Sequence, residues 1–165
     1  MAADFPVHQV CVRDDEAVHI YEGPMADFSL ANTQSLPCTR SVTYTEDGTR
    51  MALVNEKDVK IYDTFTKECV QTIGRGDVEG LAFSPLGTFV VTYERKAPDG
   101  KDNVFAFNVA TGEPVLKTHQ KEMGKDEGAW PPIRWTPDEQ LCAHMVKSEI
   151  RLFNGHDPSG EQLSK

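Results

Sequence analysis

Short runs of alternating apolar and polar residues, each bounded by a turn, cover most of the chain. Three segments share one layout, an alternating run that ends in an aromatic residue and a turn rich in Gly, Pro, Asp or Ser; they are residues 41–48, 80–87 and 132–139. Such turn residues supply a positive φ, a fixed φ or a side-chain hydrogen bond to their own backbone. The layout therefore predicts a strand and a tight turn, three times over.

Further apolar runs follow each turn in a constant order. Second runs lie at residues 51–54, 89–93 and 141–145. Third runs lie at residues 59–63, 104–108 and 149–154, with an earlier copy at 18–22. Fourth runs close two of the units, at residues 68–73 and 114–118. No window keeps the i, i+3, i+4 apolar spacing of a helix for long, so we predict an all-β chain.

One aromatic residue in each third run marks the period of the repeat. Tyr21, Tyr62, Phe107 and Phe153 are separated by 41, 45 and 46 residues. A four-stranded propeller blade takes about 40 to 50 residues, so the spacing predicts one blade per repeat. We predict three to four WD40-like β-propeller blades within one partial domain spanning residues 1–165. The expected units lie near residues 7–35, 41–73, 80–118 and 132–154, with a tail at 155–165.

Three or four blades of this width rarely close a ring. The sequence therefore predicts an open arc of a larger propeller. Apolar residues on the outward faces of the two end blades should then stay unburied, within residues 7–21 at one end and 141–153 at the other. Two polar segments, residues 95–102 and 119–129, are expected to be loops at blade edges.

Composition places the chain among folded proteins of a reducing compartment. Apolar residues make up 39% and charged residues 26% of the chain, within the globular range. Cys11, Cys38, Cys69 and Cys142 form no C-x-x-C pair, and no N-glycosylation sequon occurs. The first residues lack a secretory pattern, and no apolar stretch is long enough to span a membrane. We expect a cytoplasmic protein without a membrane partner.

The charge balance disfavours nucleic-acid binding. Twenty-six acidic and 17 basic residues give a net charge of -9, which repels a phosphate backbone unless the basic residues gather on one face. The most basic loop holds Lys117, Lys121 and Lys125, but Glu122 lies among them and two carboxylates follow. The local charge is nearly cancelled, so we expect this chain alone to bind initiator tRNA only weakly.

The turn at residues 74–80, Gly-Arg-Gly-Asp-Val-Glu-Gly, resembles two functional motifs. As a phosphate-binding loop it fails, because its third glycine is one place too late for G-x-G-x-x-G and no helix is expected to follow. As an Arg-Gly-Asp adhesion motif it would need an extracellular protein. We interpret it as a turn between two blades.

Candidate catalytic and metal residues are scattered along the chain. The five histidines, His8, His19, His119, His144 and His156, have no spacing typical of metal ligands. His144 lies in an apolar run and is expected to be a hydrogen-bonded blade residue. No G-x-S-x-G or cysteine-protease signature occurs. We predict no catalytic residue, no metal and no cofactor.

Two further groups have both a functional and a structural interpretation. The acidic run at residues 14–16 could bind a cation, but a solvated hairpin turn fits it better. Tyr44, Phe83 and Trp135 could stack on nucleic-acid bases. Since all three hold the same place in the repeat, just before the turn, we predict that they pack one blade against the next.

The repeat pattern, aromatic-Ser-Pro-x-Gly, apolar strand, V-x-I-Tyr-Asp, resembles a degenerate WD40 repeat. Tyr62-Asp63, Phe107-Asn108 and Phe153-Asn154 stand where that repeat carries Trp-Asp, and no Gly-His precedes the blades. The departure favours a divergent propeller over a regular seven-bladed one.

Longer strings resemble the eukaryotic translation initiation factor 2A family. They are residues 80–88, the 121–123 loop leading to Trp130-Pro131, residues 136–143 and residues 149–153, within a resemblance that runs from about 18 to 154. The family implies a nine-bladed propeller near the N-terminus, association with the small (40S) ribosomal subunit and other initiation factors, and delivery of initiator methionyl-tRNA. Contacts with that tRNA and with mRNA are implied for regions missing from this chain. A general WD40-like adaptor for protein partners is the alternative, and an enzyme with an active site in the propeller channel is a third.

Overall fold

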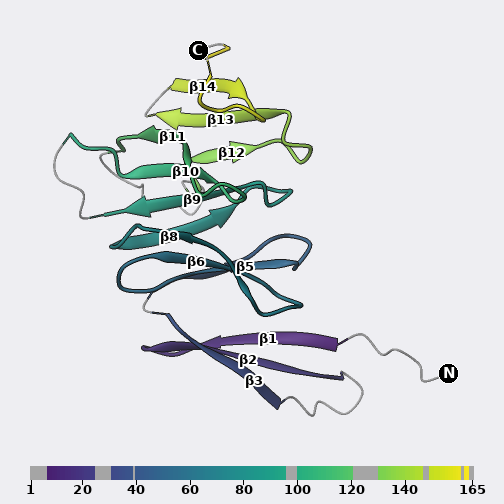
Figure 1. The fold of residues 1–165 in the computed structure, drawn as a ribbon. Helices are drawn as coiled ribbons and strands as arrows, with labels where there is room; N and C mark the ends of the chain where they lie inside the picture. Colours follow the sequence, from purple (N-terminus) through teal and green to yellow (C-terminus); the bar gives the residue numbers. More distant parts are fainter. Residues whose placement is uncertain are drawn as a thin grey trace.

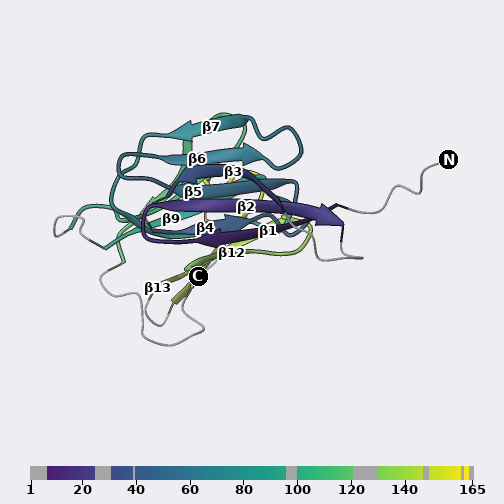
Figure 2. The ribbon, with the colours of Figure 1, turned by 90° about the horizontal axis from the view of Figure 1, so that it is seen from below.

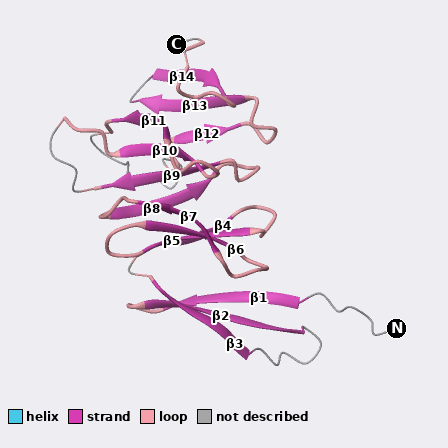
Figure 3. Cartoon of the chain, in the orientation of Figure 1, coloured by secondary structure: helices cyan, strands magenta, loops and turns pink. Residues whose placement is uncertain are grey.

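The computed structural model describes residues 7–24, 31–38, 40–95, 100–120, 130–146, 149–160 and 162–163. All regular elements in these residues are strands, as Figure 3 shows, and they form four antiparallel sheets. The prediction of an all-β chain of propeller blades is confirmed. Parts of both predicted edge loops, residues 96–99 and 121–129, lie outside the described residues.

Each sheet keeps its strands in chain order. The first blade contains β1 (Val7–Arg13), β2 (Ala17–Pro24) and β3 (Ala31–Pro37). The second contains β4 (Val42–Tyr44), β5 (Arg50–Val54), β6 (Val59–Asp63) and β7 (Cys69–Ile73). The third contains β8 (Val78–Phe83), β9 (Phe89–Glu94), β10 (Val104–Asn108) and β11 (Pro114–Thr118). The fourth contains β12 (Ile133–Trp135), β13 (Leu141–Val146) and β14 (Glu149–Asn154).

Strand β3 is the element that the hydrophobic pattern missed. Its sequence, Ala-Asn-Thr-Gln-Ser-Leu-Pro, is polar, and Leu36 is its buried hydrophobic residue. The strand forms because its backbone pairs with β2, from Ala17 opposite Pro37 to Glu22 opposite Ala31. An outermost strand needs little apolar surface, so alternation is a weak signal for it.

The blades stack face to face (Figures 1 and 2). The core lies between them. Between the first and second blades pack Val18, Ile20, Leu36, Cys38, Met51, Leu53 and Tyr62. Between the second and third pack Ala52, Val54, Val59, Ile61, Ile73, Val78, Leu81, Val90, Phe105, Phe107 and Val109. Between the third and fourth pack Val91, Val104, Ala106, Ile133 and Cys142. Each inner blade therefore contributes apolar side chains from both of its faces.

The aromatic residue before each turn packs toward the preceding blade, as predicted. Tyr44 lies against the cluster shared with the first blade, and Phe83 lies against the cluster shared with the second. Trp135 stacks on Phe89 of the third blade, with ring centroids 5.3 Å apart and an angle of 12° between the planes. Such a pair adds about 0.5–1.5 kcal/mol to the burial of the two rings.

Polar contacts between successive turns add to this packing. Glu139 is buried with a left-handed φ of 55°, and its Oε1 accepts a 2.8 Å hydrogen bond from the backbone N–H of Leu86 in the neighbouring blade. Nearer the N-terminus, the Tyr44 hydroxyl donates to Gln9 Oε1 at 2.9 Å, and Gln9 Nε2 donates to Glu22. The bond to Glu139 links the turns of the third and fourth blades, and the bond from Tyr44 to Gln9 links strands of the first and second blades.

The two end blades keep apolar side chains in contact with solvent. In the first blade Val10 and Val12 are exposed; in the fourth, Leu141, Met145 and Ile150 are exposed. These residues lie on the faces that point away from the stack, because their strand neighbours Cys11 and Cys142 pack inward. The described residues thus form an open arc with both end faces uncovered, as predicted.

His144 is an exception in the core between the third and fourth blades. The side chain is 2% exposed, and by strand register it takes the place that Leu53 has in the second blade. Contrary to the sequence expectation, His144 makes no hydrogen bond to another described residue, and its Nε2 is buried. Burial, together with the nearby Arg151 charge, lowers the pKa of His144 to about 4.

The open ends predict self-association. Apolar sheet faces of this kind bind each other or unfolded chains, so the isolated 165-residue chain should form oligomers or aggregates as its concentration rises. Ile150→Ser together with Met145→Ser should shift the equilibrium toward monomer, whereas Thr66→Ser at an exposed turn should not. Sedimentation velocity over a concentration series measures this. A monodisperse unmodified chain with a sharp thermal transition would contradict it.

His144 predicts a pH dependence of stability. The unfolded chain, in which the imidazole has its ordinary pKa of 6.5, binds more protons than the folded chain between pH 6.5 and 4. The free energy of unfolding should therefore be at its full value above pH 6.5 and fall toward pH 4, by at most about 1.4 kcal/mol per pH unit. Urea unfolding followed by tryptophan fluorescence should lose this slope in His144→Leu. The exposed-site control His156→Gln should retain it.

Candidate interaction surface

Turns from alternate strand connections gather at one end of the stack. In the second, third and fourth blades, the turn after the first strand and the turn after the third strand lie at the same end, because neighbouring strands are antiparallel. We call this end the turn face; it contains residues 45–49, 64–68, 84–88, 109–113 and 136–140. Two large apolar side chains stand out from it, Phe65 at 80% exposure and Leu86 at 63%.

The turns that carry these side chains are held by their own polar residues. Asp63 Oδ1 accepts hydrogen bonds from the N–H groups of Phe65 at 2.9 Å and Thr66 at 2.8 Å. Asp47 and Asp138 hold the turns in the second and fourth blades in a similar way. These hydrogen bonds lower the pKa of all three carboxyl groups. Phe65 is therefore presented on an ordered turn.

Shallow grooves flank both exposed side chains. A groove of about 360 Å³ beside Phe65 is lined by Gln9, Glu22, Gly48, Thr64 and Lys67. Lys67 Nζ and Glu22 Oε2 form an ion pair of 2.6 Å there. A second groove, of about 330 Å³, lies beside Leu86 and includes Arg50 and Asn108. An apolar side chain next to polar grooves is a typical anchor for a protein partner.

The opposite end of the stack is acidic near the N-terminus. A hollow of about 520 Å³ is lined by the loops around Asp15, Glu16, Glu56 and Asp58, with Lys57 as its basic residue. Within the acidic run, Asp14 Oδ1 accepts hydrogen bonds from the N–H groups of residues 16 and 17 at 2.8 and 2.7 Å. The interpretation of this run as a hairpin turn is confirmed, and its carboxylates repel phosphates.

The Gly-Arg-Gly-Asp segment connects the second blade to the third, as predicted. The Arg75 guanidinium lies 3.8 Å from the centroid of the Phe105 ring, and its Nε contacts Glu94 Oε1 at 2.6 Å. Asp77 has a left-handed φ of 58° and faces Arg40, with 3.6 Å between Oδ1 and Nη2. Both charged side chains of the motif thus serve contacts within the chain.

The histidines with described side chains lie on different strands and loops. His19 is in the first blade, His119 follows β11, His144 is in the fourth blade and His156 contacts Gln140. The side chain of His8 lies outside the described residues. Among the residues that the structure describes, no group of three or more His, Cys, Asp or Glu side chains could hold a metal ion. The described residues also contain no helix that is long and apolar enough to cross a membrane.

One hydrogen-bond chain that the sequence did not reveal joins three strand ends of the first blade. His19 Nδ1 lies 3.0 Å from Ser35 Oγ, and His19 Nε2 lies 2.8 Å from Asp14 Oδ2. This bond to His19 is the main reason why the pKa of Asp14 falls to about 2. A Ser-His-Asp nucleophile site uses the opposite ring nitrogens and a buried carboxylate, whereas Asp14 is 57% exposed. The chain of bonds fits a surface brace.

Of the three lysines considered for RNA binding, the structure describes one. Lys117 lies in β11 and is exposed, while Lys121 and Lys125 fall outside the described residues. The described residues therefore do not test the prediction that the nearly cancelled charge of this loop gives weak binding of initiator tRNA.

Comparison of the sequence with known proteins finds similar proteins of one kind in three organisms. The chain is 31% identical over 118 residues to eukaryotic translation initiation factor 2A of Dictyostelium discoideum. The aligned region covers 70% of this chain and 19% of that protein. It is 26% identical to the factor 2A of Drosophila melanogaster over 93% of this chain, and 28% identical to that of Schizosaccharomyces pombe over 76%. The chain spans 26% and 22% of those two relatives. No protein-family model matches the chain.

Solved structures share the fold. A crystal structure of a eukaryotic initiation factor superposes with a TM-score of 0.81 at 22% identity, covering 96% of this chain and 40% of the other. The C-terminal WD40 domain of Sif2 superposes with a TM-score of 0.63 at 11% identity, covering 90% of this chain and 42% of the other. These likenesses establish the fold, and the sequence relatives establish the kinship. The chain is a stretch of WD40-like propeller blades homologous to eukaryotic translation initiation factor 2A.

Proposed function

We propose that the chain is a propeller scaffold in translation initiation and associates with the small (40S) ribosomal subunit in the cytoplasm. The observation that carries the proposal is its similarity to three factor 2A proteins, over 70% to 93% of its length. Residues 1–165 act together as one partial propeller domain, because every core cluster is shared between consecutive blades.

The scaffold works by binding, without a catalytic residue, a metal or a cofactor. Its turn face supplies the contact. Phe65 and Leu86 are large apolar side chains held clear of the surface on ordered turns. Aromatic side chains in such positions commonly supply most of the binding energy of a protein interface. The partners on this face are proteins, either of the small subunit or other initiation factors.

RNA contacts belong to other parts of the complex. The net charge of -9 and the carboxylates around the acidic hollow disfavour phosphate binding, which needs a basic face. Initiator tRNA and mRNA are therefore held by regions outside this chain.

A general adaptor for protein partners is the second candidate. The same exposed Phe65, with its polar groove, would suit a peptide partner unrelated to translation. The two candidates differ in whether ribosomal particles bind the chain.

Co-sedimentation with purified 40S subunits separates the two candidates. The chain should pellet with 40S particles at low salt, and Phe65→Ser should reduce the bound fraction several-fold by removing the apolar anchor. Val70→Ser, a matched exposed substitution on β7, should bind as the unmodified chain does. If no chain pellets with 40S at low salt, the ribosomal proposal is wrong and the adaptor stands.

Binding of initiator tRNA should be weak. Fluorescence anisotropy at about 150 mM salt, where the Debye length is about 8 Å, should give an affinity no tighter than the non-specific range of about 10⁻⁶ to 10⁻⁴ M. Sub-micromolar binding that disappears in a chain carrying Lys117→Ala, Lys121→Ala and Lys125→Ala would contradict this prediction.

A further inference from the structure

The aromatic side chain of Phe65 is not required by the turn that carries it. Phe65, Ala110 and His156 hold the same place in successive blades. Their backbone N–H groups all donate to the side-chain oxygen two residues earlier, at 2.9, 2.9 and 3.0 Å. The hydrogen bond thus forms equally with an alanine or a histidine in that place. The phenyl ring, 80% exposed, adds nothing to the turn itself.

Leu86 departs from its repeat in a similar way. In the second and fourth blades the corresponding residue is Asp47 or Asp138, whose carboxylate accepts hydrogen bonds within its own turn. Leu86 offers no acceptor, and its N–H donates to Glu139 Oε1 of the fourth blade. A leucine here gives up local hydrogen bonds and leaves 63% of its side chain exposed. Burial against a partner would stabilise such a side chain.

The first turn of the second blade, residues 45–49, joins the two apolar side chains into one surface. The turn of Phe65 is bound to it through Thr64 Oγ1, which donates to one of its carbonyls at 2.7 Å. Arg50, which follows it directly, donates at 3.4 Å to a carbonyl in the turn of Leu86. Both grooves of the turn face include part of residues 45–49. One partner can therefore contact both apolar side chains at once.

The spacing of the two side chains suits a short extended segment. Phe65 follows the third strand of the second blade, and Leu86 follows the first strand of the third blade. With about 10 Å between facing sheets and about 4.8 Å between neighbouring strands, the two turns are about 14 Å apart. An extended segment rises about 3.3 Å per residue, so side chains four residues apart on one of its faces span this distance.

Exposed carboxylates surround the two apolar side chains. On the turn face they belong to Glu46, Asp47, Glu68, Glu113 and Asp138. The same residue ranges contain one basic side chain, Lys67, which is already paired with Glu22. Such a surface repels phosphates and anionic lipids and attracts lysine and arginine. The chemistry of a matching partner is therefore apolar and basic.

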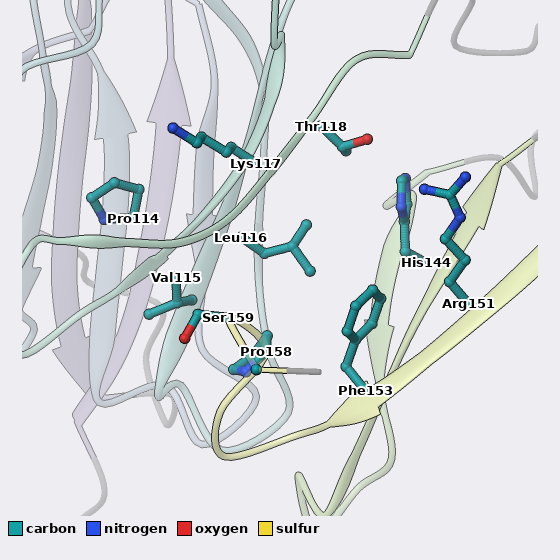
Figure 4. A pocket seen from close by; sticks show the side chains of 11 residues that line it. Pro114, Val115, Leu116, Lys117, Thr118, His144, Arg151, Phe153, Pro158 and Ser159 are labelled. Atoms are coloured by element: carbon teal, nitrogen blue, oxygen red, sulfur yellow. The ribbon is translucent and has the colours of Figure 1, made fainter. Parts of the chain in front are cut away.

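A second copy of this chain is a poor match. Two of its cationic side chains, Lys117 and Arg151, line a groove of about 410 Å³ at the outer rim of the fourth blade (Figure 4). The apolar residues beside them, Leu116 and Phe153, are half-buried within that groove and cannot reach the protruding side chains of another copy. The net charge of -9 also opposes the pairing of two copies. The occupant is a different protein.

We propose that the turn face binds an extended basic segment of a partner protein, with two apolar side chains four residues apart packed against Phe65 and Leu86. Lysine or arginine side chains of the segment pair with the surrounding carboxylates. The inference rests on the proposed role of the turn face in protein binding and names the chemistry of its partner. The apolar contacts supply most of the affinity, and the charges supply selectivity.

A designed peptide tests the proposal on the 165-residue chain by fluorescence anisotropy. The probe is the labelled peptide Lys-Lys-Leu-Ser-Thr-Ser-Leu-Lys-Lys. One control peptide replaces both leucines with serine, and the other replaces the four lysines with glutamate. Both should bind at least tenfold more weakly than the probe. Probe affinity should also fall as salt rises from about 0.1 to 1 M, because the Debye length shortens from about 10 to 3 Å.

Substitutions of the two apolar side chains locate the bound probe. Phe65→Ser and Leu86→Ser should each weaken probe binding about tenfold, and both should leave the chain folded because the side chains are exposed. Val70→Ser, at a comparably exposed position on β7, should bind the probe as the unmodified chain does.

A matched pair of charge variants separates the turn face from the overall negative charge. Glu46→Gln together with Glu68→Gln should weaken probe binding several-fold and flatten its salt dependence. These turns stay ordered, because their hydrogen bonds go to Asp47 and Asp63. Glu16→Gln together with Glu56→Gln removes the same charge from the acidic hollow at the opposite end and should leave probe binding unchanged.

Several results would overturn the proposal. They are no binding of the probe, equal binding of either control peptide, or equal losses in the two charge variants. Self-association of the chain that disappears in Phe65→Ser would assign the face to a second copy and would also overturn it. Binding to 40S particles that Phe65→Ser reduces, without binding of the probe, would overturn this inference alone. Binding of the probe without binding to 40S particles would support it and overturn only the ribosomal role.

Discussion

The structure depends on one constraint, that a propeller blade has two apolar faces and cannot cover either of them by itself. Each sheet is one layer thick, so its core exists only where a second sheet lies against it. In this chain Leu53 and Ile61 are both fully buried although they belong to opposite faces of the second blade. The end blades have one covered face each, which is why Val12 and Ile150 remain exposed.

Polar contacts set how the layers lie on each other. Apolar packing between flat sheets is weakly directional, whereas a hydrogen bond to a buried carboxylate fixes both distance and angle. Glu139 provides such a bond to the neighbouring turn, and a hydrogen bond from the Tyr44 hydroxyl to the Gln9 amide oxygen links the first two blades. The turns, already ordered by Asp47, Asp63 and Asp138, thus become a fixed surface.

The separation between an apolar core and polar, ordered turns bears on function. The Ser-His-Asp arrangement of the first blade is a solvent-exposed brace. What the fold offers is an end of the stack with ordered turns and two exposed apolar side chains, Phe65 and Leu86. This surface suits binding to other proteins, in line with the homology to an initiation factor and with the WD40-like fold.

The sequence by itself determined most of the strands, their order and the blade period, because alternation and turn residues are local signals that report burial directly. It also determined that Tyr44, Phe83 and Trp135 pack against the core between blades, since their place in the repeat is constant. It missed β3, whose polar residues are ordered by backbone pairing with β2. Only the tertiary structure decided that Asp14, His19 and Ser35 meet, that Glu139 is buried and that His144 finds no hydrogen-bond partner among the described residues. These outcomes depend on which residues of neighbouring strands and blades come to lie opposite one another, and a pattern of apolar positions carries no information about that.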